Sequence, residues 1–131
     1  MARDRAEVIR RALDAYNRGN YDAASEYLHP DVVLVPPGGQ APYRGVERVR
    51  QWMEPDAFLT QDVEALEITE ADSGLVLVHQ RSRITGAQSG IEMQPEFWTV
   101  WTFDESGLVT QVENFLLHQA DEAREAAGLA G

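Results

Sequence analysis

The second half of the chain constrains the fold most strongly, because its pattern predicts a run of strands joined by short turns. The predicted strands cover residues 62–69, 75–85, 91–103 and 108–118. The breaks between them are rich in Gly, Ser and Asp, a composition typical of turns between antiparallel neighbours. The third run is longer than the usual ~5–6 residues. Long strands in a small sheet twist and curl, so we expect the sheet to enclose space on its concave side.

The first half predicts helices that could close this space. Apolar residues at helical spacing predict helices over 4–18, about 21–28 and 45–53, with a short strand at 32–35. The second helix is expected to stop at a proline. A final helical turn or two is expected over 121–127. Helices followed by a meander of strands form an α+β layout, so we expect a single α+β domain.

The charge and composition of the chain exclude several classes of function. The net charge of the 131-residue chain is −11. This acidity disfavours nucleic acid and anionic membranes, because phosphate binding needs a cationic surface. All eleven basic residues are arginine, so a Schiff-base lysine is excluded, and the absence of cysteine excludes thiolate chemistry and disulfides.

Targeting and metal-binding patterns are also missing from the sequence. No apolar run approaches the ~18 residues of a membrane span, and the charged start does not resemble a signal peptide. We therefore expect a cytoplasmic protein. The three histidines share neither a spacing nor a predicted face, so we expect no metal site and no cofactor.

The turns predict which side chains share one face of the sheet. Phe103 is expected to pair with Leu108, and Ile84 with Ile91 in the preceding hairpin. Because strand side chains alternate between faces, both registers predict the same mostly apolar face, which we expect to be concave. It should carry Val76, Val78, Gln80, Ser82, Met93, Phe97, Thr99, Trp101, Asn114, Leu116 and His118.

The opposite, convex face combines aromatic and charged residues. Trp98, Val100 and Phe115 are expected there, among glutamates and arginines. Exposed aromatics inside a charged rim usually mark an interface. We therefore expect a homodimer through the convex face.

Four segments carry a resemblance that spans nearly the whole chain. In order they are Ala15–Asp22, Tyr27–Val32, Tyr43–Glu47 and Trp101–Val109. Their order and spacing resemble the nuclear transport factor 2-like superfamily, in particular its SnoaL-like and ketosteroid-isomerase-like branch. The resemblance implies one domain over residues 1–131, with a cone-shaped, curved antiparallel sheet wrapped by three N-terminal helices around a pocket. It also implies that dimers through the convex face are common.

The residues that perform the chemistry in the resembling enzymes do not carry over. The position of the steroid isomerases' catalytic aspartate matches Pro36, and that of their protonated aspartate matches Thr99. Their oxyanion-hole tyrosine matches about Ala12, with Tyr16 one turn later. The histidine–aspartate pair of the polyketide cyclases has no counterpart on the late strands. Proton abstraction next to a carbonyl needs a base and an oxyanion donor, and neither lies at the family's positions.

Elimination leaves His118 as the candidate acid or base, because histidine titrates near neutral pH and His118 is expected at the pocket end of the last strand. Tyr16 would donate a hydrogen bond to a substrate oxygen. The alternative for His118 is a hydrogen-bonded histidine at a strand end, and the alternative for Tyr16 is an aromatic core residue. The expected ligand-binding residues, which suit a cyclic, weakly polar molecule, are Trp52, Gln80, Phe97, Thr99, Trp101 and Asn114.

Two functions of different classes remain open. The first is a cofactor-free enzyme that isomerises, cyclises or dehydrates a small cyclic molecule, which rests on family analogy. The second is a non-catalytic module that binds a ligand or dimerises, which rests on the missing acid–base pair. A pocket in which His118, Tyr16 and Asn114 converge would favour the enzyme, and a pocket filled by aromatic side chains would favour the module.

Overall fold

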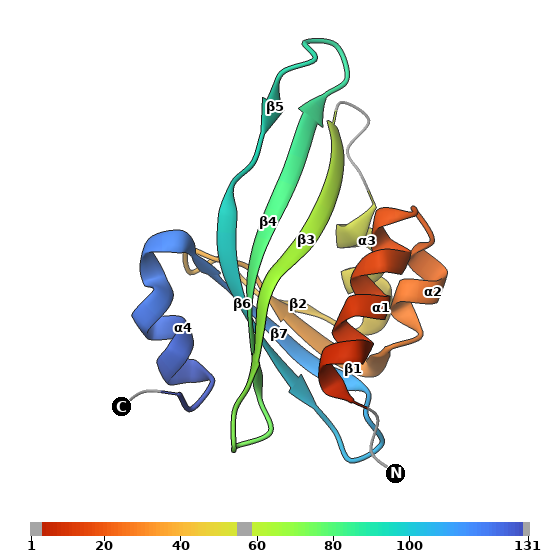
Figure 1. Cartoon of the computed structure of the whole chain (residues 1–131). Coiled ribbons are helices and arrows are strands. Elements are labelled where there is room, and N and C mark those ends of the chain that lie inside the picture. The colour runs from red at the N-terminus through yellow and green to blue at the C-terminus, as the bar shows by residue number, and fades with distance from the viewer. Residues whose placement is uncertain (1–3, 55–58, 130–131) are drawn as a thin grey trace.

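The computed structural model describes residues 4–54 and 59–129, in which helices flank both faces of a curved sheet (Figure 1). The helices are α1 (Arg5–Asn17), α2 (Tyr21–Ser25), α3 (Val46–Met53) and α4 (Ala120–Ala126), with a short 3-10 helix, η1 (Leu117–Gln119), before α4. The strands are β1 (Leu28–Val35), β2 (Tyr43–Arg44), β3 (Leu59–Glu70), β4 (Val76–Gly86), β5 (Glu92–Met93), β6 (Glu96–Phe103) and β7 (Val109–Leu116). No helix in these described ranges is long and apolar enough to cross a membrane.

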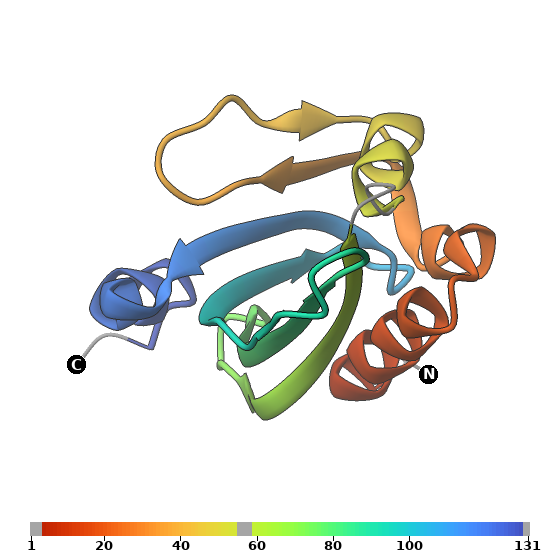
Figure 2. The ribbon, with the colours of Figure 1, turned by 90° about the horizontal axis from the view of Figure 1, so that it is seen from above.

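The strands form one sheet in the order β2-β1-β7-β6-β4-β3, with β5 paired to β4. The sheet is mixed, because β1 runs parallel to β7 while the other pairs are antiparallel. Seen from above, the sheet curls, with α1, α2 and α3 on one side and α4 on the other (Figure 2). The expected α+β class, with a curved sheet and three N-terminal helices, is confirmed.

The first helix begins and ends where its sequence predicts. The Asp4 carboxylate caps it by accepting a hydrogen bond from the Ala6 amide at 3.0 Å. Gly19, with φ 74°, follows its C-terminus, where the left-handed conformation suits glycine. The buried stripe of α1 includes Val8 and Ile9, which pack with Val32, Val49 and Trp101 in the main core between the helices and the sheet.

Several predicted boundaries are wrong, including the start of the first strand, which lies at Leu28 instead of residue 32. The second helix ends at Ser25 instead of near residue 28, because β1 already begins at Leu28 and includes Pro30. The run 91–103 is interrupted at Pro95, whose carbonyl accepts from the Ser82 amide at 2.9 Å but which has no amide hydrogen of its own. The last strand ends at Leu116.

The predicted registers are each displaced by two residues, and this leaves the faces unchanged. Thr99 pairs with Asn114 rather than Val112. One residue of this displacement arises because Phe103 pairs with Val109 instead of Leu108, and the other from the register shift between Thr102 and Phe103. Likewise His79 pairs with Trp98 rather than Glu96. An even displacement keeps every side chain on its predicted face.

The convex face is covered by the chain's own α4. Val100 and Phe115 are 4% and 9% exposed, and they pack with Leu77, Ala123 and Ala127 in a second core. The Trp98 indole donates a hydrogen bond to the Leu117 carbonyl at 3.2 Å. The expected exposure of Val100 and Phe115 is therefore wrong, and the argument for a dimer through these side chains no longer applies.

Candidate functional site

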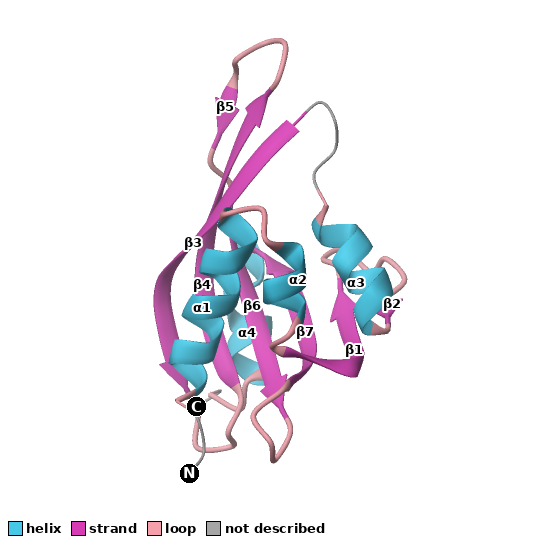
Figure 3. Cartoon of the chain, turned by 90° about the vertical axis from the view of Figure 1, so that its right-hand side faces the viewer, coloured by secondary structure: helices cyan, strands magenta, loops and turns pink. Residues whose placement is uncertain are grey.

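A cavity lies between the sheet and helices α1, α2 and α3, which all contribute lining residues. In Figure 3 these three helices lie on the side of the sheet that faces the viewer. About 110 Å³ is open to the centre of a water molecule, and the empty space including the mouth is about 710 Å³. Side chains of α1, α2, α3, β1, β3, β4, β6 and β7 line it. The first of these volumes is the one comparable with the ~300–1,000 Å³ usual for small-molecule sites, so the cavity in this structure is a small one.

The described lining is apolar apart from five neutral polar residues. These are Tyr16, Gln61, Gln80, Thr99 and Asn114. No aspartate, glutamate, histidine or arginine lies among the described lining residues. An unpaired charge buried in such a site would be strongly disfavoured, so the cavity suits a neutral molecule.

The side chains that the sequence predicts for ligand binding come together here. The cavity is lined by Tyr16, Trp52, Gln80, Phe97, Thr99, Trp101 and Asn114. Their role in binding stays a prediction. Trp52 lies 45% exposed, and its ring centroid is 6.4 Å from that of Tyr43.

His118 is not part of this site. It lies in η1, two positions beyond the end of β7, and its side chain is exposed. The expectation of a concave-facing His118 is wrong because the chain leaves the sheet at Leu116, so the alternation of a strand no longer applies. His118, Tyr16 and Asn114 therefore do not converge.

A buried hydrogen-bonded chain crosses the sheet floor of the cavity. The Trp101 indole Nε1 donates to Thr99 Oγ1 at 2.8 Å, and Thr99 Oγ1 donates to Gln80 Oε1. Thr99 and Gln80 are 2% and 3% exposed. Nearby, Gln61 Nε2 donates to Ser82 Oγ at 3.0 Å. Sequence patterns placed most of these residues on one face but gave no direction for their hydrogen bonds.

Asn114 links the floor of the cavity to the parallel strand. Its Nδ2 donates to the Val35 carbonyl at 2.9 Å. This bond uses the amide's donor end and leaves its oxygen as the end available to accept.

Tyr16 is the titratable residue of the described lining. Burial, followed by the nearby Tyr21 and Asp62, raises the pKa of Tyr16 from 10.0 to about 12. The hydroxyl has no hydrogen-bond partner among the described residues, and the ring meets that of Tyr21 edge-on at 5.8 Å. At neutral pH it is therefore a donor that the protein leaves unused.

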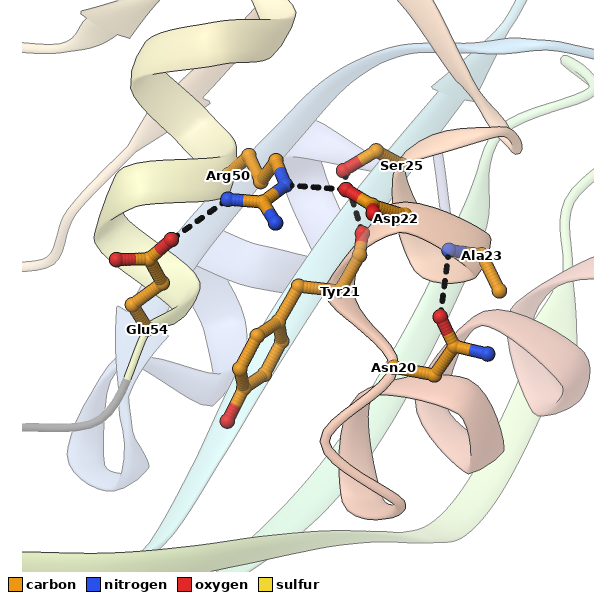
Figure 4. A network of polar contacts seen from close by, with 7 residues as sticks. All are labelled: Asn20, Tyr21, Asp22, Ala23, Ser25, Arg50 and Glu54. Atoms are coloured by element: carbon orange, nitrogen blue, oxygen red, sulfur yellow. Dashed lines mark hydrogen bonds and ion pairs between the residues drawn. The ribbon is translucent and has the colours of Figure 1, made fainter.

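A pair of ion contacts fixes the helices beside the cavity mouth. Arg50 of α3 lies between Asp22 of α2, at 2.7 Å, and Glu54, at 2.6 Å (Figure 4). Asn20 caps α2 through the Ala23 amide at 3.1 Å. The contact between Arg50 and Asp22 joins α3 to α2, and both helices contribute lining residues. The pair between Arg50 and Asp22 has no signal in the sequence, because the two residues lie far apart along the chain.

Known structures share this fold at low sequence identity. A proposed polyketide cyclase from Xanthomonas campestris pv. campestris is 16% identical, covers 88% of this chain and 92% of its own, and superposes with a TM-score of 0.75. RV0760c from Mycobacterium tuberculosis, solved in complex with estradiol-17beta-hemisuccinate, is 14% identical, covers 83% and 90%, and has a TM-score of 0.74. SalBIII, an epoxide hydrolase/cyclase-like enzyme of pyran ring formation in salinomycin, is 18% identical, covers 85% and 88%, and also has a TM-score of 0.74.

At these identities the likeness shows the fold alone. Comparison with curated proteins finds no matching relative. The sequence model of the SnoaL-like domain matches residues 9–112, which is most of the chain. The cone-like sheet, the helices over its concave face and this match agree, and the chain belongs to the SnoaL-like family.

Proposed function

We propose that the protein binds a small, neutral, mostly apolar cyclic molecule in the cavity. The observation that carries this proposal is the lining: apolar and aromatic walls, a few neutral polar groups, and no charged side chain among the described lining residues. Such a site gains affinity from apolar burial and orientation from a few hydrogen bonds. The fold neighbour solved with estradiol-17beta-hemisuccinate, and another described as a computationally designed 17-OHP binder, support the cyclic, mostly apolar character of the ligand.

Binding is tested with 1-tetralone, a two-ring ketone, by thermal shift and calorimetry. Ligand binding to the folded state raises the melting temperature by mass action. Leu13→Trp fills the cavity from α1, so it should remove the shift. Leu66→Trp places the same side chain at an exposed position of β3 outside the lining, so the shift should remain. A full shift in Leu13→Trp would place the binding elsewhere.

A second candidate is cofactor-free isomerisation, cyclisation or dehydration in the same cavity. The observation that favours it is the unpartnered Tyr16 hydroxyl, which could stabilise a developing oxyanion. With its raised pKa, Tyr16 cannot act as a base near neutral pH. A proton abstraction would therefore need a base from the substrate or from a bound water.

The two candidates differ in what they do to the α-protons of the ketone. A catalyst of enolisation exchanges these protons with D₂O, which proton NMR detects as loss of the α-proton signal. Exchange faster than in buffer, and slower in Tyr16→Phe, would support the enzyme. Saturable binding without accelerated exchange would support the non-catalytic module for this ligand class.

A further inference from the structure

The direction of the buried hydrogen-bonded chain follows from what each group can donate. An indole nitrogen is a donor only, so the Trp101 bond to Thr99 uses a lone pair of the threonine oxygen. The Thr99 hydroxyl proton then needs an acceptor, because the side chain is 2% exposed. Gln80 Oε1 is the acceptor that Thr99 contacts. If the Gln80 amide were flipped, its NH₂ group would face Thr99, and the buried hydroxyl proton would have no acceptor.

This direction fixes the other end of the Gln80 amide. With Oε1 turned to Thr99, the NH₂ group is the free end of a side chain that lines the cavity. Gln80 is 3% exposed, and its Nε2 has no partner among the described residues. The nitrogen therefore borders the cavity itself.

The other two amides of the lining each use one of their two N–H donors within the protein. Gln61 Nε2 is bonded to Ser82, and Asn114 Nδ2 to the Val35 carbonyl. Gln80 is therefore the lining amide whose two N–H donors are both without a partner among the described residues, and the Tyr16 hydroxyl is the other unpartnered donor.

We propose that Gln80 is the carbonyl-recognising group of this pocket, and that Trp101 and Thr99 act as positioning residues that hold its NH₂ end toward the ligand. The ligand class is then a neutral cyclic ketone or lactone, rather than a hydrocarbon of the same shape. This inference rests on the proposed binding function. It adds which atom of the ligand is recognised, the carbonyl oxygen, and which residue recognises it, Gln80.

The test compares 1-tetralone with tetralin, which has the same two rings and no oxygen. Calorimetry on the wild-type protein should give about ten-fold tighter binding of the ketone, the scale of one net hydrogen bond. In Gln80→Met, which keeps the length but removes the amide donor, most of this preference should be lost while tetralin affinity is kept. Tyr16→Phe, which removes the other unpartnered donor, should keep most of it. Gln111→Met makes the same change on β7 outside the lining, so it should keep the wild-type preference.

The positioning role has its own measurement. Thr99→Val keeps Gln80 and the volume of the side chain but frees the amide to turn. The ketone preference should shrink, whereas a purely structural effect would weaken both ligands equally. Equal weakening would overturn the positioning role of Thr99.

An infrared measurement keeps the proposal testable even where Gln80→Met does not fold. The ¹³C-labelled carbonyl stretch of 1-tetralone in the wild-type complex should lie at lower frequency than that of the free ketone in an apolar solvent such as hexane. An unshifted stretch, or equal affinity for ketone and hydrocarbon, would overturn the Gln80 assignment while leaving the binding function intact. If neither ligand binds saturably, the proposed function fails and the assignment fails with it.

Discussion

Tyr16 illustrates how burial sets the chemistry of a single side chain in this cavity. Its phenol lies among apolar groups, so the neutral form is favoured and the pKa rises to about 12. A phenol in this state donates a hydrogen bond over the whole physiological range. Leaving the Tyr16 hydroxyl without a protein partner costs little free energy while water can enter the cavity and accept its hydrogen bond.

The first prediction concerns the pH dependence of stability that Tyr16 causes. Its pKa is raised on folding, so its contribution to stability is complete below about pH 10 and is lost as the pH rises through about 12. The loss should be on the order of 1–2 kcal/mol, because two pKa units correspond to ~2.7 kcal/mol before screening by solvent. Urea titrations between pH 9 and 11.5 should therefore show a shallower fall in Tyr16→Phe than in the wild type, and parallel curves would count against the shift.

The sequence placed site residues correctly where they lie inside a regular strand, because the alternation of strand side chains determines the face of each residue. Thr99 and Trp101 lie in the cavity because they sit inside a regular strand, where each second side chain shares a face. His118 was misplaced because it lies beyond the strand, where no period applies. The direction of the Thr99–Gln80 bond depends on tertiary contact and leaves no trace in one sequence.

At the scale of elements, the helices by the cavity mouth depend on Arg50. We predict that Arg50→Met lowers the free energy of unfolding slightly, because it breaks two solvent-exposed ion pairs. The difference from the wild type should shrink in 1 M NaCl, where charges are screened within about 3 Å. The control is Arg18→Met, whose pair with Asp14 is more exposed and lies within a single stretch of chain. A larger loss in the control would contradict the bridging role of Arg50.

The element that sequence reasoning undervalued is α4. It was expected only as a final turn or two, yet it buries the apolar centre of the convex face. The alternation of β6 and β7 correctly predicted that Val100 and Phe115 point away from the pocket. It could not predict what covers them, because a helix that packs on a sheet has no register with it.

We predict that Ala123→Arg costs at least about 3 kcal/mol, because Ala123 is fully buried and a charged side chain cannot be accommodated there unpaired. Urea denaturation gives the loss of stability, and increased binding of a hydrophobic dye would report the uncovered sheet. Glu125→Arg introduces the same charge at an exposed site of the same helix and should change stability by less than ~0.5 kcal/mol. Equal effects of the two variants would mean that α4 does not pack as described.

At the scale of the whole molecule, a neutral cavity lies inside a strongly acidic chain. The net charge of −11 creates a negative potential around the protein, and the described lining offers no cation to offset it. An anionic ligand would meet two separate penalties. One is the long-range repulsion, which salt screens, and the other is the loss of hydration inside the cavity, which salt does not affect.

The last prediction separates these two penalties with a pair of ligands of the same shape, tetralin-1-carboxylate and tetralin-1-carboxamide. At pH 7 and 10 mM NaCl, where the screening length is about 30 Å, the carboxylate should bind at least ~10-fold more weakly than the amide, the equivalent of about 1.4 kcal/mol. At 300 mM NaCl the gap should narrow without closing, because only the repulsion is screened. The affinity of the amide should not depend on salt and serves as the control. A carboxylate that binds as tightly as the amide would show that a cationic group takes part in the occupied site, and a gap independent of salt would assign the whole penalty to the cavity.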